Sequence, residues 1–323
     1  MTLEVTLRNL IIIGNGFDLH HKMHTKYIDY REYLRKDSLC RSILERYDEK
    51  SDPFWSDIEN GLKIDCKEFV EEYITAFNFK DVNPGEQIHQ DQKAVDRINE
   101  LRKVYREYIQ LTGVEFYQWL YDTYYSVIGK MKKDEGLFDN RDENWFINFN
   151  YTLTLEDLYN IEKKSILHIH GLLNKNIKSQ LICGGNIKER REELARSEIQ
   201  FGCIENNPEL INEMNILKDI KSQNSTFDVD RLKTDLQYYL KSSYKNIEKN
   251  YMKLEKYIES CGKIDQIIVM GNNIFGADFG YYEKILIPKY NAIKWILYCH
   301  DDNFETADRL RDEYNLNVEI RKW

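Results

Sequence analysis

Polar and glycine residues that could bind or transform a ligand directly follow five short apolar runs. They lie in the segments Gly14–Asp18, Asn150–Thr152, His170–Gly171, Gly271–Asn273 and His300–Asp302. Glycines allow a backbone to approach a phosphate closely, amides orient hydroxyl groups and water, and a histidine can accept a proton near neutral pH. These residue types suit a site that binds phosphate and sugar groups and moves a proton.

The glycine pair in IIIGNGFD (11–18) has two interpretations. A glycine pair after a buried strand permits a tight turn and a close approach to phosphate. The third glycine of a dinucleotide fingerprint is missing, since Leu19 stands there, so an ordinary strand-to-helix turn fits equally well. The charge of Asp18 would repel a phosphate and suits a ribose hydroxyl or an amide better. Alternatively, Asp18 caps the following helix.

The segment HIHG (168–171) contains two histidines and a glycine. A metal pair is one interpretation, but no third ligand has a clear spacing. A histidine at the end of a strand faces a ligand while a rigid element holds it, so we predict that His170 is a general base. We interpret His168 as a core histidine.

Three further histidines, His20, His21 and His24, follow the glycine pair. The spacing of His20 and His24 matches half of a zincin helix, but His21 stands where that motif needs a glutamate. We therefore interpret all three as histidines of a mobile loop and expect no metal site. Thr25 has the residue type of an N-cap for a helix that carries Tyr27.

The apolar runs before these polar segments predict the strands of one sheet. They cover residues 9–13, 145–149, 165–169, 266–270 and 294–299, with a weaker run at 317–320. Near-continuous apolar strands without clean alternation are typical of a parallel sheet covered on both faces. We therefore predict an α/β fold in which all five polar segments meet at the carboxyl edge of the sheet, where such proteins bind ligands.

Two long helical stretches interrupt this sheet. We predict a single α/β domain over residues 1–323, with helical insertions at approximately 60–140 and 205–262. Apolar residues from Leu240 to Ile258 recur at the spacing of a heptad seam, over fewer than three heptads. We interpret this stretch as a helix packed on the domain; the alternative is a coiled-coil or dimer contact.

Composition narrows the class of protein. The aromatic content of 13% argues against disorder, and the net charge of −9 lacks the positive footprint of a nucleic-acid-binding protein. No apolar run is long enough for a membrane-spanning helix, and the first residues do not form a secretory signal. Six scattered cysteines without a CxxC pair fit reduced thiols. We expect a cytoplasmic protein without membrane or nucleic-acid partners.

The segments that carry these residues resemble those of the AbiH family, bacterial abortive-infection proteins that act against phage. The matching segments are LIIIGNGFDLHHKMHTKY (10–27), WSDIE (55–59), FNYTLTLEDLY (149–159), HIHG (168–171) and IIVMGNNIFGADFGYY (267–282). Their order also resembles, more distantly, that of the sirtuin-like NAD-binding domains. The resemblance implies a Rossmann-like, mostly parallel sheet, a role in phage defence, and hydrolysis of NAD or a related nucleotide at its N-glycosidic bond.

The resemblance also implies roles for individual residues. Asn150 would be the catalytic asparagine and His170 the catalytic histidine. The implied cofactor-binding residues are Gly14, Asn15, Gly16, Phe17, Asp18, Thr25, Thr152, Gly171, Gly271, Asn272, Asn273 and Asp278. The cysteines of a deacetylase zinc module have no counterpart, so we expect neither a metal nor protein deacylation.

Two alternative functions stay open. Thr152 stands where the sirtuin-like domains have an aspartate, and Asn272-Asn273 stands where AbiH proteins usually have His-Ser. If these changes reflect a lost activity, the chain would be a non-catalytic nucleotide sensor or scaffold in phage defence. The helix at 240–258 would then serve assembly with itself or with a phage or host partner. The second alternative is a metal-dependent phosphohydrolase or nuclease that uses the histidines of HIHG with Asp301 or Asp302.

Overall fold

The computed structural model describes residues 6–34, 41, 115–138, 142–173, 247–299 and 304–323. Nearly all of them belong to one of two compact units, formed by Met1–Tyr33, Phe116–Gln200 and Asn246–Trp323. Most of the two predicted helical insertions lies outside the described residues, as do the WSDIE segment and His300–Asp302.

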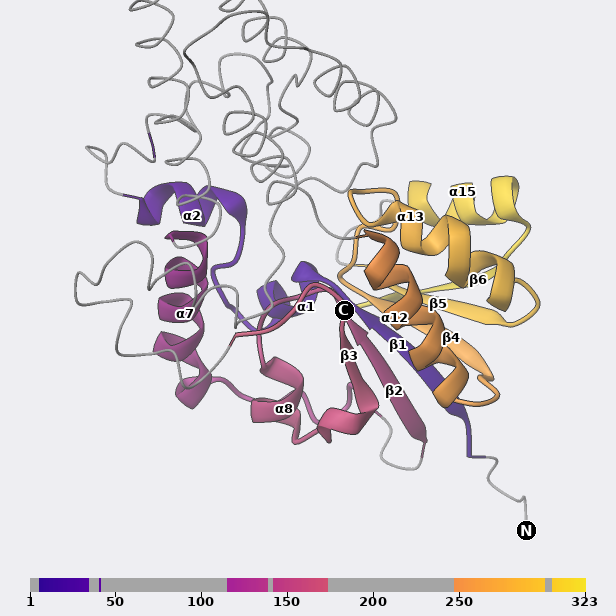
Figure 1. Ribbon diagram of the computed structural model, residues 1–323, viewed down its shortest axis with the longest axis horizontal. Coiled ribbons are helices and arrows are strands. Elements are labelled where there is room, and N and C mark those ends of the chain that lie inside the picture. The colour runs from indigo at the N-terminus through magenta and orange to yellow at the C-terminus, as the bar shows by residue number, and fades with distance from the viewer. Residues whose placement is uncertain (1–5, 35–40, 42–114, 139–141, 174–246, 300–303) are drawn as a thin grey trace, which may run out of the picture. The chain divides into compact units, whose positions relative to one another are not determined.

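Six strands form one fully parallel sheet (Figure 1). They are β1 (Arg8–Ile13), β2 (Glu143–Asn148), β3 (Ile166–His168), β4 (Gln266–Met270), β5 (Lys294–Cys299) and β6 (Asn317–Lys322). Their order across the sheet is β3-β2-β1-β4-β5-β6, and every neighbouring pair is parallel. All six predicted strands are present, with small differences at their ends, and the predicted Rossmann-like α/β fold is confirmed.

Strand β1 shows why its apolar run is continuous. Successive side chains of a strand point to opposite faces of the sheet. Leu10 and Ile12 accordingly join one hydrophobic cluster, and Ile11 and Ile13 join another. Both clusters are buried, so the sheet is covered on both faces, and the β-branched isoleucines suit this pleated surface.

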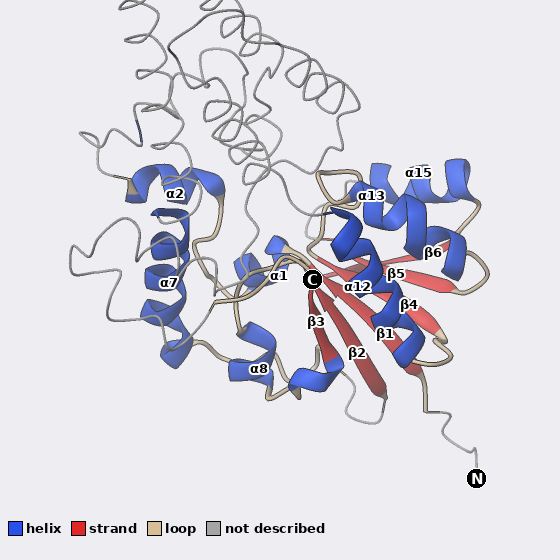
Figure 2. Ribbon diagram, in the orientation of Figure 1, coloured by secondary structure: helices blue, strands red, loops and turns tan. Residues whose placement is uncertain are grey.

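Helices cover the sheet and connect its strands (Figure 2). The α-helices are α1 (Asn15–His20), α2 (Tyr27–Tyr33), α7 (Phe116–Val127), α8 (Thr154–Tyr159), α12 (Ile247–Ser260), α13 (Phe279–Tyr281), α14 (Ile287–Tyr290) and α15 (Glu305–Tyr314). Two short 3₁₀ turns, η3 (Ile128–Lys130) and η4 (Lys163–Ser165), and one π-helical turn, η6 (Tyr282–Leu286), complete the described elements. Among these helices, none combines the length and hydropathy that crossing a bilayer requires.

Helix α12 contains the described end of the predicted heptad seam. Leu254 and Ile258 are almost completely buried and belong to the same cluster as Leu10 and Ile12 of β1. This part of the seam therefore packs on the domain, as the simpler interpretation expects. The start of the seam, at Leu240, lies outside the described residues.

The strand order places a topological switch point between β1 and β4. From β1 the chain builds β2 and β3 on one side of the sheet, and then returns to build β4, β5 and β6 on the other side. In open α/β sheets, ligands bind outside the carboxyl ends of the strands at such a point. The loops that begin at Gly14 and Gly271 lie there.

Candidate functional site

The loops after β1 and β4 pack backbone against backbone. The Gly14 amide donates a hydrogen bond to the Met270 carbonyl oxygen (3.0 Å), and the Gly16 amide donates one to the Gly271 carbonyl oxygen (2.8 Å). A Cβ on Gly16 would lie 2.6 Å from the Gly271 Cα, and Gly271 itself has a φ of +65°. The contact between the two loops thus accounts for the glycines at these positions, as the strand-to-helix-turn interpretation expects.

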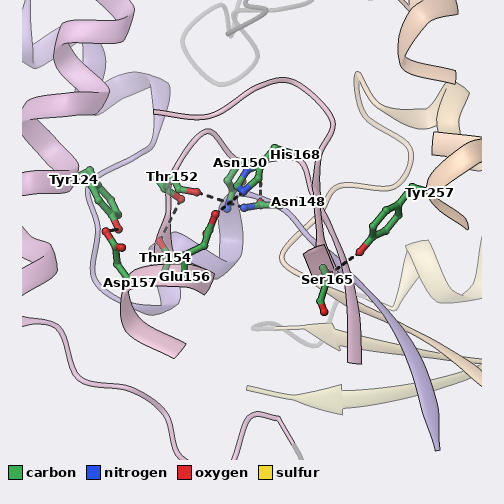
Figure 3. A network of polar contacts seen from close by, with 10 residues as sticks. All are labelled: Tyr124, Asn148, Asn150, Thr152, Thr154, Glu156, Asp157, Ser165, His168 and Tyr257. Carbon is green, nitrogen blue, oxygen red and sulfur yellow. Dashed lines mark hydrogen bonds and ion pairs between the residues drawn. The ribbon is translucent and has the colours of Figure 1, made fainter. Parts of the chain in front are cut away.

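Asn150, after β2, connects its loop to the loop after β1. Its side-chain nitrogen donates to the Gly14 carbonyl oxygen (2.9 Å), and its backbone amide donates to Oδ1 of Asn148 (2.9 Å) (Figure 3). A carbonyl oxygen can only accept, so this contact fixes which end of the Asn150 amide faces Gly14. The Asn150 side-chain oxygen therefore faces away from Gly14. An acceptor of this kind can orient a hydroxyl group or a water molecule.

Asp18 lies in the first turn of α1 and is buried. The hydroxyl of Thr152 donates to its Oδ2 and that of Thr154 to its Oδ1, both at 2.8 Å. Burial raises the pKa of Asp18 to about 6, although the two threonine hydrogen bonds act in the opposite direction. The alternative that Asp18 caps the helix is wrong, because Gly14 is the N-cap residue and both Asp18 oxygens bind threonine hydroxyls instead.

His170 follows β3 and lies beside an acid from the loop after β4. Its Nε2 is 3.4 Å from Oδ1 of Asp278, and its side chain is 2% exposed. The rings of Phe149 and Tyr281 pack against the imidazole, with centroids 5.4 and 5.8 Å away. A carboxylate beside the ring can restrict the orientation of the imidazole. Asp278 keeps 17% of its side chain exposed, so the pair is mostly buried but its carboxyl group still contacts solvent.

A different acid, Glu156, contacts His168. Its Nε2 lies 2.9 Å from Oε1 of Glu156 in α8, and both side chains are about nine-tenths buried (Figure 3). His168 is therefore a largely buried histidine held by Glu156, which agrees with the interpretation of a structural role. The two histidines of HIHG therefore contact different carboxylates rather than one ion. Within the described ranges, no group of three or more His, Cys, Asp or Glu side chains could hold a metal ion.

The mobile-loop interpretation is wrong for His21, which is 8% exposed. Its Nδ1 lies 2.7 Å from the Phe17 carbonyl oxygen and its Nε2 lies 2.6 Å from the hydroxyl of Tyr159. Because the carbonyl needs a donor, Nδ1 carries the proton and Nε2 accepts from the tyrosine. Burial lowers the pKa of His21, which agrees with a neutral ring. His20 lies against the Trp323 ring, and His24 is exposed.

Thr25 does not cap α2. The helix begins at Tyr27, and the backbone amide of Lys26 donates to the Asp29 carboxylate (2.9 Å), which takes the capping role. The side chain of Asn15 donates to the Thr25 carbonyl oxygen (2.9 Å), so these two predicted site residues are in contact.

The remaining predicted site residues lie in different surroundings. Phe17 is a fully buried core residue. Gly171, with a φ of 88°, turns the chain after His170. Asn272 accepts a hydrogen bond from the Tyr282 hydroxyl (2.7 Å), while Asn273 is exposed. The structure thus brings together three sets at the carboxyl edge: Asn150 with the glycine loops, Asp18 with Thr152, and His170 with Asp278.

Sequence reasoning missed three polar residues that support these sets. Asn148 ends β2 as a buried amide within an apolar run, and this unusual placement could have identified it. Thr154 follows Thr152 at a spacing of two, which offers a weaker signal. Tyr282, in the first turn of η6, is one of 23 tyrosines in the chain, so its residue type alone could not single it out.

Fold and site together define a Rossmann-like α/β protein with an acid–histidine pair and a buried asparagine network at the carboxyl edge of its sheet. The family model described as "Bacteriophage abortive infection AbiH" matches residues 10–299. The chain therefore belongs to the AbiH family, and membership implies a role in abortive infection, a bacterial response to phage. No curated protein and no solved structure matches the chain.

Proposed function

We propose that this AbiH protein acts in phage defence by hydrolysing NAD, or a closely related nucleotide, at the N-glycosidic bond. The observation that carries the proposal is the pairing of His170 with Asp278 at the carboxyl edge. Asn150 follows the strand next to β3 and has a side-chain oxygen that faces away from Gly14. A base with its supporting acid, and an amide that can orient a hydroxyl or water, are groups that such a hydrolysis requires.

The proposed reaction breaks the bond between ribose C1′ and the nicotinamide nitrogen, which takes the electron pair. A water oxygen bonds to C1′ and passes a proton to His170, so the products are nicotinamide and ADP-ribose. Asn150 orients the water or a ribose hydroxyl, and Asp278 stabilises the imidazolium. Glycoside hydrolysis proceeds through an oxocarbenium-like state of this kind, and general-base assistance typically contributes about 100- to 10,000-fold.

The positions of these groups just after rigid elements also support the proposal. Asn150 and His170 each lie two residues beyond the last residue of a neighbouring parallel strand, β2 and β3. Catalytic groups need to be held within about 0.5 Å of their productive geometry, and a sheet holds them better than a long loop does.

The test is to incubate purified protein with NAD and to follow nicotinamide and ADP-ribose by liquid chromatography. Wild type should release the two products in equal amounts. His170→Ala should lose roughly 100-fold or more in rate, whereas the control His24→Ala, which changes an exposed histidine, should match wild type. Full turnover by His170→Ala would exclude His170 as the base.

The alternative functions predict different outcomes of the same test. A non-catalytic sensor would bind NAD or ADP-ribose tightly in calorimetry and release no product. A metal-dependent phosphohydrolase would cleave the diphosphate rather than the glycosidic bond, and a chelator would abolish that activity. If NAD neither reacted nor raised the melting temperature, NAD would not be the ligand.

A further inference from the structure

We propose that Asp18 is a positioning residue, which holds the loop that presents Asn150 through the hydroxyls of Thr152 and Thr154. The inference rests on the proposed function, because it assigns a task within the same site. Asp18 belongs to the segment after β1, whereas the threonines belong to the segment after β2. The three side chains, called here the Asp18 clamp, therefore join helix α1 to the loop after β2 and to the first residue of α8.

The contacts of the clamp indicate that Asp18 acts through other residues rather than on a substrate. Each carboxylate oxygen accepts one threonine hydroxyl at 2.8 Å, and the two hydroxyls are 3.2 Å apart. Asp18, Thr152 and Thr154 are 1%, 2% and 1% exposed. A carboxylate this deeply buried, with a donor on each oxygen, has the surroundings of an anchor rather than those of a ligand-binding group.

The clamp fixes the chain on one side of Asn150, and Asn148 fixes it on the other. Oδ1 of Asn148 accepts the backbone amide of Asn150 (2.9 Å), and Nδ2 of Asn148 reaches the carbonyl oxygen of Thr152 (3.5 Å). Figure 3 shows Asn148, Asn150 and Thr152 gathered in one network. The chain is thus held on both sides of Asn150 in the sequence. The Asn150 side chain is held as well, because its Nδ2 donates to the Gly14 carbonyl oxygen.

Such a network would determine the rate of the reaction more than the binding of the substrate. A displacement of about 1 Å in a group near the reacting atoms can cost about 100-fold in rate. Loosening the clamp should therefore lower kcat, while KM, which depends on groups elsewhere in the site, should change little.

The test compares Asp18→Ala with the isosteric Asp18→Asn. The asparagine can accept from one threonine hydroxyl and donate to the other, so it keeps the clamp while removing the charge. With NAD as substrate, Asp18→Ala should lower kcat by roughly 10- to 100-fold, with KM within about threefold of wild type, and Asp18→Asn should restore most of kcat. Tyr124→Phe is the matched control, since it removes a nearby contact to Asp157 that does not belong to the clamp.

Two outcomes would overturn the inference. Unchanged kcat in Asp18→Ala would show that the clamp does not position Asn150, and an equal loss in Asp18→Asn would show that the charge itself is needed. Should Asp18→Ala fail to fold, Thr154→Val removes one donor at constant size, and Thr154→Ser should restore the activity that Thr154→Val loses.

Hydrogen–deuterium exchange separates this inference from the proposed function. In the ligand-free protein, the backbone amides of residues 148–155 should exchange faster in Asp18→Ala than in wild type or Asp18→Asn. If wild type released no nicotinamide, the proposed function would fail, and the exchange rates would still decide whether Asp18 holds this loop. Equal exchange in all three proteins would reject the clamp.

Discussion

Asp18 is a buried carboxyl group whose surroundings predict a pH-dependent stability. Burial raises its pKa from 3.8 to about 6, against the weaker opposing effect of the threonine hydroxyls. The folded state therefore binds this proton more tightly than the unfolded state. The resulting contribution to stability is fully present below about pH 4 and is lost as the pH rises through about 6.

Asp18→Asn should remove this pH dependence. The free energy of unfolding of wild type should fall by about 2 kcal/mol relative to Asp18→Asn between pH 4.5 and 7.5. Urea denaturation of both proteins at the two pH values measures the difference. Tyr124, whose hydroxyl contacts Asp157, is a titratable group that interacts with Asp18, and burial keeps its pKa far above this range. A difference that stays constant with pH would show that Asp18 does not titrate there.

Asn150 and His170 illustrate what could be predicted of the site from the sequence. Both directly follow apolar runs, and parallel strands bring the residues after such runs to one edge. The partners of Asp18 could not be predicted, because Thr152 and Thr154 are more than 130 residues away in the chain. His21 was misjudged for a similar reason, since its partner Tyr159 comes from the end of α8.

The close packing of the loops after β1 and β4 requires glycine where the two loops touch. Gly271 has a φ of +65°, and a side chain there would meet the backbone of Gly16 and Phe17. A non-glycine residue in this conformation costs about 1–3 kcal/mol before any clash is counted. We therefore expect Gly271→Ala to lower the free energy of unfolding by at least about 2 kcal/mol.

Gly129→Ala is the control for this prediction. Gly129 lies in η3, and an added Cβ there would have no atom within 4 Å. Its free energy of unfolding in urea should stay within about 0.5 kcal/mol of wild type. Equal stability of Gly271→Ala and Gly129→Ala would show that the two loops do not pack as closely as described.

Helix α12 should contribute to the stability of the sheet through one face. Leu254 is 0% exposed in the core, whereas Met252, two residues earlier, is 64% exposed. Leu254→Ala should cost about 2–5 kcal/mol in the free energy of unfolding, and Met252→Ala should be nearly neutral. Thermal or urea unfolding of the two variants checks this, and similar losses in both would contradict the packing of α12 on β1 and β4.

The strands were easier to predict than the elements around them. Buried parallel strands have a distinctive continuous apolar pattern, which located all six to within a few residues. The short helices gave a weaker signal. Helix α2 begins after Lys26 rather than after Thr25, because a carboxylate one turn into the helix, that of Asp29, takes the capping hydrogen bond.

The chain as a whole combines a family role in abortive infection with a candidate site at the carboxyl edge of its sheet. If the site consumes NAD, infection would lead to the loss of a cofactor on which the metabolism of the infected cell depends. Phage restriction and NAD loss should then depend on the same residue, His170.

The most direct measurement is the NAD content of bacteria that carry the wild-type or the His170→Ala gene, before and after infection with a phage that the wild type restricts. We predict that NAD falls several-fold after infection only in cells with the wild type, with ADP-ribose and nicotinamide rising together, and that only these cells reduce the phage yield. Restriction of the phage by the wild type while NAD stays at its level before infection would contradict the proposed activity.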